Sequence, residues 1–154
     1  MSSPAMQLEK LTLSITEEIH VKAPLGTTFE ALLEQLGPAQ VRGDGTPMPM
    51  KLEARPGGRW YRDLGNEEGH LWGHVQAIKT PTLLEMYGPL FMSYPVMSNV
   101  QYRLSEEKGG TLIKFQHLAL GLIDDEHRQG VGTGWKLIHE NVRKRAESRA
   151  GRKS

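Results

Sequence analysis

Six histidines are the first candidates for chemistry, because imidazole binds metals and transfers protons near neutral pH. His70 and His74 have the spacing of a zinc-binding pair on a helix. Their segment has the pattern of a strand, however, and residues four apart on a strand lie ~13 Å from one another. His20, His127 and His139 also lack chelating spacing. We therefore predict no metal site.

One carboxylate and one imidazole occupy faces that should look inward. Glu17 interrupts the alternation of the strand-like segment 11–21 by falling on its apolar face. His117 shares a face with Ile113 and Phe115. Two interpretations stay open. In the first, the two groups are structural: each has a hydrogen-bonding partner, or a bulge in the strand turns Glu17 outward. In the second, they form a polar anchor or a general base in an apolar pocket.

Other catalytic patterns are incomplete. The chain has no cysteine, which excludes thiolate chemistry and disulfides, and it has no Gly-x-Ser-x-Gly motif. Residues 130–134 (GVGTG) imitate a phosphate-binding loop but neither follow a strand nor carry the required Lys-Ser/Thr. We expect these glycines to let a helix pack closely against a sheet or a ligand. The sequence favours a non-catalytic role and predicts no cofactor.

Aromatic residues and methionines form either ordinary core or the wall of an adaptable apolar pocket. Together with the polar candidates they give a list of predicted cavity residues: Glu17, Trp60, Trp72, His74, Tyr87, Tyr102, Phe115, His117 and Trp135. Which face of the strand at 70–79 meets the cavity stays open. Trp72 shares a face with His70 and His74, whereas apolar residues occupy the opposite face.

The composition predicts one globular domain over residues 10–146, with flexible termini at 1–9 and 147–154. Of the 154 residues, 38% are hydrophobic and 24% charged, and the net charge of +1 gives no indication of a nucleic-acid partner. The first residues lack the apolar core of a secretory signal, and no apolar run reaches the ~20 residues of a membrane span. We therefore expect a cytoplasmic protein without a membrane span.

The elements that must position these residues follow from periodicity. After the strand at 11–21, Pro24 opens a short helical segment that ends at Gly37 and Pro38. Turn residues then separate strand-like segments at 51–55, 59–64, 70–79, 82–88, 96–104 and 111–120. A final helix is predicted over 124–146, with an apolar stripe made by Val131, Trp135, Ile138 and Val142.

This order predicts an α+β fold in which a curved antiparallel sheet of about seven strands wraps around the long C-terminal helix. The short helix and loops cover one end of the groove, which leaves a cavity between sheet and helix.

Four stretches carry a resemblance to a known family. They are Ile19–Pro24 with Thr28–Leu32, Arg55–Trp60, Gly73–Leu84, and Gly109–Leu112 with Gly134–Trp135. In this order they resemble the START-like, or helix-grip, superfamily (SRPBCC), and within it the family of the C-terminal domain of the heat-shock-chaperone ATPase activator. The stretches at 64–71 and 89–95 look specific to this chain, so the shape of the pocket does not follow from the resemblance.

The resemblance implies a helix-grip fold in which the first strand pairs with the last, so that Glu17 and His117 could be neighbours. We predict that the cavity binds a small hydrophobic or amphipathic ligand. Two alternatives remain, a co-chaperone that stimulates a chaperone ATPase and an enzyme of the polyketide-cyclase or aromatase kind. The ligand, a chaperone partner and homodimer formation are left undetermined by the sequence.

Overall fold

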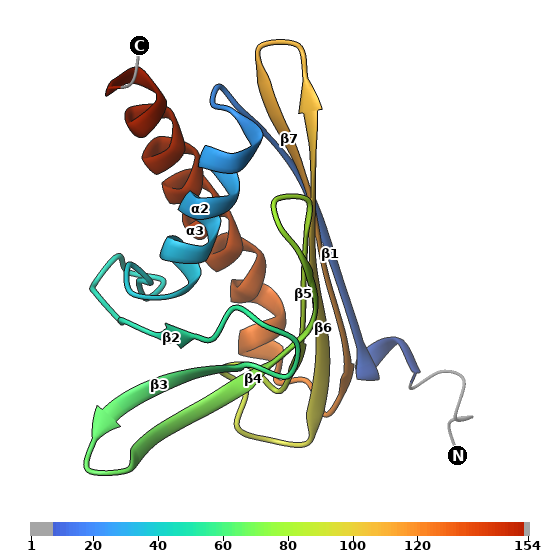
Figure 1. Ribbon diagram of the computed structural model, residues 1–154. Coiled ribbons are helices and arrows are strands. Elements are labelled where there is room, and N and C mark those ends of the chain that lie inside the picture. Colours follow the sequence, from blue (N-terminus) through green and yellow to red (C-terminus); the bar gives the residue numbers. More distant parts are fainter. Residues whose placement is uncertain (1–7, 153–154) are drawn as a thin grey trace.

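A computed structural model describes residues 8–152 of the chain. Seven strands form one antiparallel sheet in the order β1-β7-β6-β5-β4-β3-β2 (Figure 1). The strands are β1 (Thr12–Val21), β2 (Lys51–Leu52), β3 (Arg59–Gly65), β4 (Glu68–Lys79), β5 (Leu83–Gly88), β6 (Val96–Glu107) and β7 (Gly110–Gly121). The helices are a 3-10 turn η1 (Glu9–Leu11), α2 (Leu25–Leu36) and α3 (Asp125–Arg152). The helix-grip architecture predicted from the sequence is confirmed.

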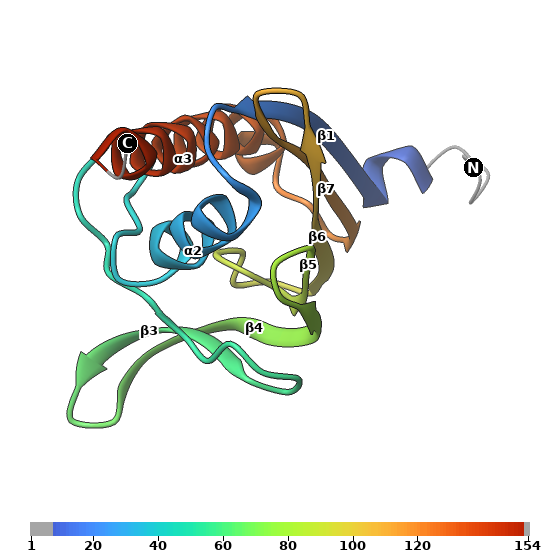
Figure 2. The ribbon, with the colours of Figure 1, turned by 45° about the horizontal axis from the view of Figure 1, so that its top comes forward.

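Both α2 and α3 lie on the concave side of the sheet. Strands β1, β7, β6 and β5 form an upright wall, and the sheet then bends so that β4 and β3 pass beneath the helices (Figures 1 and 2). Helix α2 buries Phe29, Leu32 and Leu36. The indole Nε1–H of Trp60 on β3 donates to the carbonyl oxygen of Leu36 at 2.8 Å, which ties the end of α2 to the sheet. The sheet therefore encloses two helices, whereas the sequence emphasised only the final one.

The first and last strands pair as the resemblance implied. Glu17 lies opposite Phe115, and Ile15 lies opposite His117, so both predicted polar residues face the helices. No bulge turns Glu17 outward, because the register runs without a shift from Thr12 to Val21. Residues on one face of antiparallel neighbours keep this relation along the whole strand. The inward placement of Glu17 and His117 is thus confirmed.

Helix α3 begins at Asp125, close to the predicted start at residue 124, and ends later than the predicted residue 146. The carboxylate of Asp124 accepts a hydrogen bond of 2.7 Å from the backbone N–H of Glu126, which caps the first turn. The helix continues to Arg152, beyond the predicted end at residue 146. Arg149 pairs with Glu34 of α2 at 2.7 Å, which attaches this last part of α3 to the fold. Residues 1–7 and 153–154 lie outside the described residues.

An extra residue in β4 decides which side chains enter the interior. Trp60 pairs with Gly73, and the next residue of β3, Tyr61, pairs with Leu71, so Trp72 has no partner of its own. Such a bulge locally breaks the alternation of faces. Trp72 consequently joins Trp60 inside, where their rings meet edge to face with centroids 5.1 Å apart.

Candidate functional site

A cavity of about 540 Å³ lies between the first half of α3, strand β4 and the loops at 40–48 and 89–95. Most of its wall is apolar and consists of Met48, Trp72, Phe91, Val131, Trp135 and Ile138. Polar side chains in the lining are those of Gln40, Arg42, Glu126 and His127. An apolar hollow with a few polar groups is the usual form of a small-molecule site.

Two glycines of α3 leave part of the cavity lining without side chains. Gly130 and Gly134 are one helical turn apart, and both line the cavity. A Cβ atom built at either position meets no heavy atom within 4 Å. Of the two expected roles, close packing against the sheet or against a ligand, the first does not apply, because open room adjoins both glycines. Each glycine inside a helix costs about 1 kcal/mol relative to alanine, so the room is obtained against helix propensity.

Ring contacts join the cavity wall to its rim. Phe91 meets Trp72 with ring centroids 5.8 Å apart and meets His127 at 5.2 Å. The other face of this rim is formed by Tyr94, whose hydroxyl lies 2.8 Å from Nδ1 of His127. The backbone N–H of Asp124 donates to the same hydroxyl at 3.2 Å. The loop 89–95 is thereby attached to the first turn of α3 at the edge of the cavity.

His117 lies behind this wall in a neutral hydrogen-bonded network. Its Nδ1 accepts from the indole N–H of Trp135 at 3.0 Å, and its Nε2 lies 2.9 Å from the hydroxyl of Ser98. Indole nitrogen only donates, so Nδ1 carries no hydrogen and Nε2 donates to Ser98. Burial away from water lowers the pKa of His117 to about 4. The imidazole is therefore neutral at pH 7.

Glu17 contacts a different histidine from the expected one. Its Oε2 atom lies 3.2 Å from Nδ1 of His139 on α3, although neither atom has a hydrogen bond of good geometry. Nε2 of His139 lies 2.9 Å from the hydroxyl of Tyr102. Burial, and secondly the negative charge of Glu17, raise the pKa of Tyr102 well above its usual value. The three side chains join β1, α3 and β6 across the core.

The predicted cavity residues fall into three groups. Trp72 and Trp135 line the cavity. A second group belongs to the core beside it and is absent from its lining, namely Glu17, Trp60, Tyr102, Phe115 and His117. The third group, His74 and Tyr87, lies on the outer face of the sheet, where the two rings stack with centroids 5.8 Å apart. Neither of them is part of the cavity lining. The bulge at Trp72 puts His74 on the opposite face from Trp72, whereas Tyr87 faces outward by ordinary alternation, since its neighbours Met86 and Gly88 on β5 are buried.

Several residues of the site escaped the sequence analysis. His139 is buried four residues after Trp135, and this helical spacing was the available signal. The sequence analysis assigned the neighbouring residue, Ile138, to the apolar stripe of this helix, and Ile138 lies in the cavity wall. Met48 and Phe91 come from loops whose path no periodicity predicts. Gln40, almost fully buried in a loop rich in glycine and proline, gave no signal of its own.

Within residues 8–152, no three side chains of His, Cys, Asp or Glu gather closely enough to hold a metal ion. His70 instead lies 3.2 Å from the hydroxyl of Ser93. In the same range, no helix is both long and apolar enough to cross a membrane.

Comparison with known proteins places the chain in a family. The sequence profile described as "Activator of Hsp90 ATPase homolog 1-like protein" matches residues 22–147. The chain belongs to this family. No curated protein matches its sequence.

Solved structures share the fold of this family member. CalU16 from Micromonospora echinospora is 25% identical, with a TM-score of 0.59 over 84% of this chain and 71% of that one. The di-domain ARO/CYC protein StfQ of the steffimycin biosynthetic pathway is 11% identical, with a TM-score of 0.69, and the match covers 96% of this chain and 54% of StfQ. Ara h 8.0201 is 18% identical, with a TM-score of 0.66 over 89% of this chain and 99% of that one. The low identities of the last two relate them to this protein by fold alone.

Proposed function

We propose that the protein binds a small hydrophobic or amphipathic molecule in the cavity between α3, β4 and the loops at 40–48 and 89–95. The apolar wall of this cavity, which measures about 540 Å³, carries the proposal. Its volume lies within the range of roughly 300–1,000 Å³ that small-molecule sites occupy. Transfer of apolar ligand surface from water to this wall would supply most of the binding free energy.

The glycines that line the cavity support the same function. A helix selected for stability alone would carry side chains at Gly130 and Gly134, where an added Cβ meets no heavy atom within 4 Å. Both glycines reduce helix propensity and leave an apolar hollow beside the helix. This arrangement is expected of a site in which some stability is lost so that a ligand has room to bind.

The two alternative functions are supported by fewer observations. A co-chaperone role is supported by the family description, and a cyclase role by the resemblance in fold to StfQ. A general base for the latter would have to reach the ligand. Neither Glu17 nor His117, the two candidates from the sequence, lines the cavity, and the Trp135 side chain that contacts His117 is itself part of the lining. Ligand binding without turnover is therefore the function that the geometry favours.

Filling the cavity tests the proposal. In the wild-type protein, 1-decanol at about 100 times its dissociation constant should stabilise the fold by ~2.7 kcal/mol, which raises the unfolding midpoint by roughly 5–10 °C. In Gly134→Leu, the added side chain occupies the cavity, so this shift should disappear while the ligand-free midpoint rises. The measurement is thermal unfolding followed by circular dichroism, together with calorimetric titration of 1-decanol.

Gly132→Leu is the matched control. It adds the same side chain to the same helix at a glycine that is not part of the cavity lining, and a Cβ there also meets nothing within 4 Å. This variant should gain helix propensity and keep the response to 1-decanol. A wild-type protein that 1-decanol does not stabilise, or a Gly134→Leu variant that binds it as well as wild type does, would refute the proposal.

A further inference from the structure

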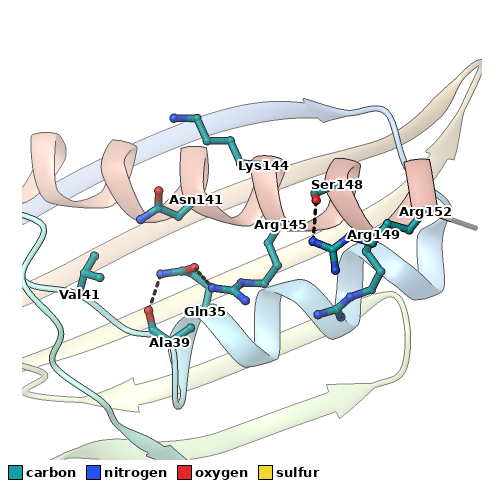
Figure 3. Close-up of a pocket in the computed structure, with 9 residues that line it drawn as sticks. All are labelled: Gln35, Ala39, Val41, Asn141, Lys144, Arg145, Ser148, Arg149 and Arg152. Atoms are coloured by element: carbon teal, nitrogen blue, oxygen red, sulfur yellow. Dashed lines mark hydrogen bonds between the residues drawn. The ribbon is translucent and has the colours of Figure 1, made fainter.

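A second hollow, of about 480 Å³, lies against the C-terminal half of α3, next to the end of α2. Figure 3 shows the basic side chains that line it, Lys144, Arg145, Arg149 and Arg152, together with Gln35 and Ser148. The Arg145 side chain reaches toward Gln35, whereas Lys144 points away from the other basic groups (Figure 3). Arginine side chains thus dominate the interior of this hollow.

Carboxylates of α2 partly balance these cations. Glu34 lies 2.7 Å from Arg149 and 3.7 Å from Arg145. Arg152 donates to the hydroxyl of Ser148 at 3.3 Å. Three guanidinium groups outnumber the carboxylates of Glu34 and Glu30, the second of which also acts on Arg149, so the hollow keeps a net positive charge that attracts anions.

The cationic hollow and the apolar cavity adjoin each other. Val41 lines both of them. On α3, Ile138 lines the apolar cavity and Asn141, one turn further, lines the cationic hollow. The two hollows therefore follow each other along one side of α3, and Val41 lies where they meet.

Two buried donors near this junction lack acceptors. The amide Nε2 of Gln40 and the guanidinium Nε of Arg145 are buried without a hydrogen-bond partner among the described residues. The orientation of the Gln40 amide is fixed by its oxygen, which accepts from the backbone N–H of Val41 at 3.1 Å. Unsatisfied buried donors are costly, and both of these call for an acceptor rather than a cation.

We propose that the protein's ligand is an anionic amphiphile. Its apolar body lies in the cavity beside Trp135, and its carboxylate or phosphate lies in the cationic hollow against Arg145 and Arg149. Ile138 and Arg145 are seven residues apart on α3, so apolar body and anionic group are separated by roughly 10 Å along the helix axis. Arginine is suited to both anions because its fork donates two parallel hydrogen bonds. This inference rests on the proposed function, since it names the ligand class of the same cavity.

The test compares ligands that share one apolar chain and differ in the head group. Decanoate, decyl phosphate, 1-decanol and decyltrimethylammonium are titrated calorimetrically into the full chain below their micelle concentrations. We expect the two anions to bind about tenfold or more tightly than 1-decanol, and the cation more weakly than 1-decanol, with an anion preference that falls as salt is added. The stronger of the two anions identifies the head group as carboxylate or phosphate.

Arginine variants locate the head group. The double variant Arg145→Met and Arg149→Met keeps the apolar stems and should lose about tenfold in affinity for the anions, with less than about twofold change for 1-decanol. Arg143→Met is the matched control, because Arg143 lies on the same helix, pairs with Glu140 and Glu147, and does not line the hollow. Retained 1-decanol binding shows that the double variant is folded.

The outcomes separate this inference from the function on which it rests. If all four decyl compounds bind equally well, or if the double variant keeps the full preference for anions, the cationic hollow does not hold the head group and this inference is wrong. The proposed function, binding of an apolar ligand in the cavity, would still hold in that case. If 1-decanol and the anions all fail to bind the wild-type protein, the proposed function itself is wrong.

Discussion

Acidification should destabilise the fold through His117. The imidazole is buried between β6 and α3, and its two hydrogen-bond partners are the uncharged groups of Ser98 and Trp135. Protonation would place a hydrogen on Nδ1, which faces the indole N–H of Trp135, so a donor would then face a donor. It would also place a charge at a buried position where, among residues 8–152, no carboxylate contributes to the pKa of His117. Both effects oppose protonation in the folded state.

The magnitude follows from the two pKa values. The pKa of His117 is 6.5 for an ordinary histidine and about 4 in the folded protein. The folded state therefore binds fewer protons than the unfolded state between these values, and the free energy of unfolding falls as the pH decreases through this window. Linkage gives a loss of roughly 2 kcal/mol between pH 7 and pH 5, and roughly 3 kcal/mol by pH 4.

Urea unfolding at a series of pH values measures this loss, and His117→Gln isolates it. Glutamine can accept from Trp135 and donate to Ser98, but it does not titrate. The other ionisable groups contribute to both proteins and cancel in the difference. We expect the wild-type protein to be more stable than the variant at pH 7 and to lose about 2 kcal/mol of that advantage by pH 5. Parallel pH profiles for the two proteins would refute the burial argument.

Four further predictions concern the core and the site. In Gly88→Ala, the added Cβ would lie 2.3 Å from a backbone carbonyl oxygen of β4, at a residue whose φ is +149°. We therefore expect the free energy of unfolding, measured with urea, to fall by more than about 3 kcal/mol. Gly26→Ala is the control and should not lower it, because a Cβ there meets nothing within 4 Å. Trp60→Phe removes the hydrogen bond to the end of α2 and should cost ~1–3 kcal/mol by the same measurement, with faster amide exchange in α2 as its local signature. Tyr102→Phe leaves the buried imidazole of α3 without its hydroxyl partner and should cost ~1 kcal/mol, so an unchanged unfolding midpoint would contradict that contact. Glu17→Gln should leave calorimetric binding of 1-decanol unchanged, because Glu17 does not line the cavity, and weakened binding would restore its role as a polar anchor.

The long elements could be predicted from the sequence because their burial is periodic. Alternation at residues 11–21 places Leu13, Ile19 and Val21 in the core, and the structure has them there. The helical stripe of Val131, Trp135 and Val142 is likewise buried. Periodicity also placed Glu17 and His117 on the inner face, since a side chain on a strand has only two directions to choose from.

Partners and cavities could not be predicted in the same way. Glu17 contacts His139 rather than His117, because the register of β1 and β7 places Phe115, not His117, opposite Glu17. Helix α3 places the imidazole of His139 next to Glu17 instead. The inward position of Trp72 and the outward position of His74 could not be predicted, because a bulge depends on how β4 pairs with β3, and a sequence pattern with strict alternation contains no extra residue.

The sequence by itself determined the order of the strands and helices and which faces of the long elements are buried, since these follow from local periodicity and turn chemistry. The fold family was indicated by the resemblance of four of its stretches to known family motifs. Only the tertiary structure decided where the chain is hollow. The cavity lies where Gly130 and Gly134 face a wall made from β4 and two loops without filling the space, and the cationic hollow exists because α2 brings Glu34 and Gln35 beside the arginines of α3. Empty space between elements is a property of their relative positions, which long-range packing sets and no single segment specifies.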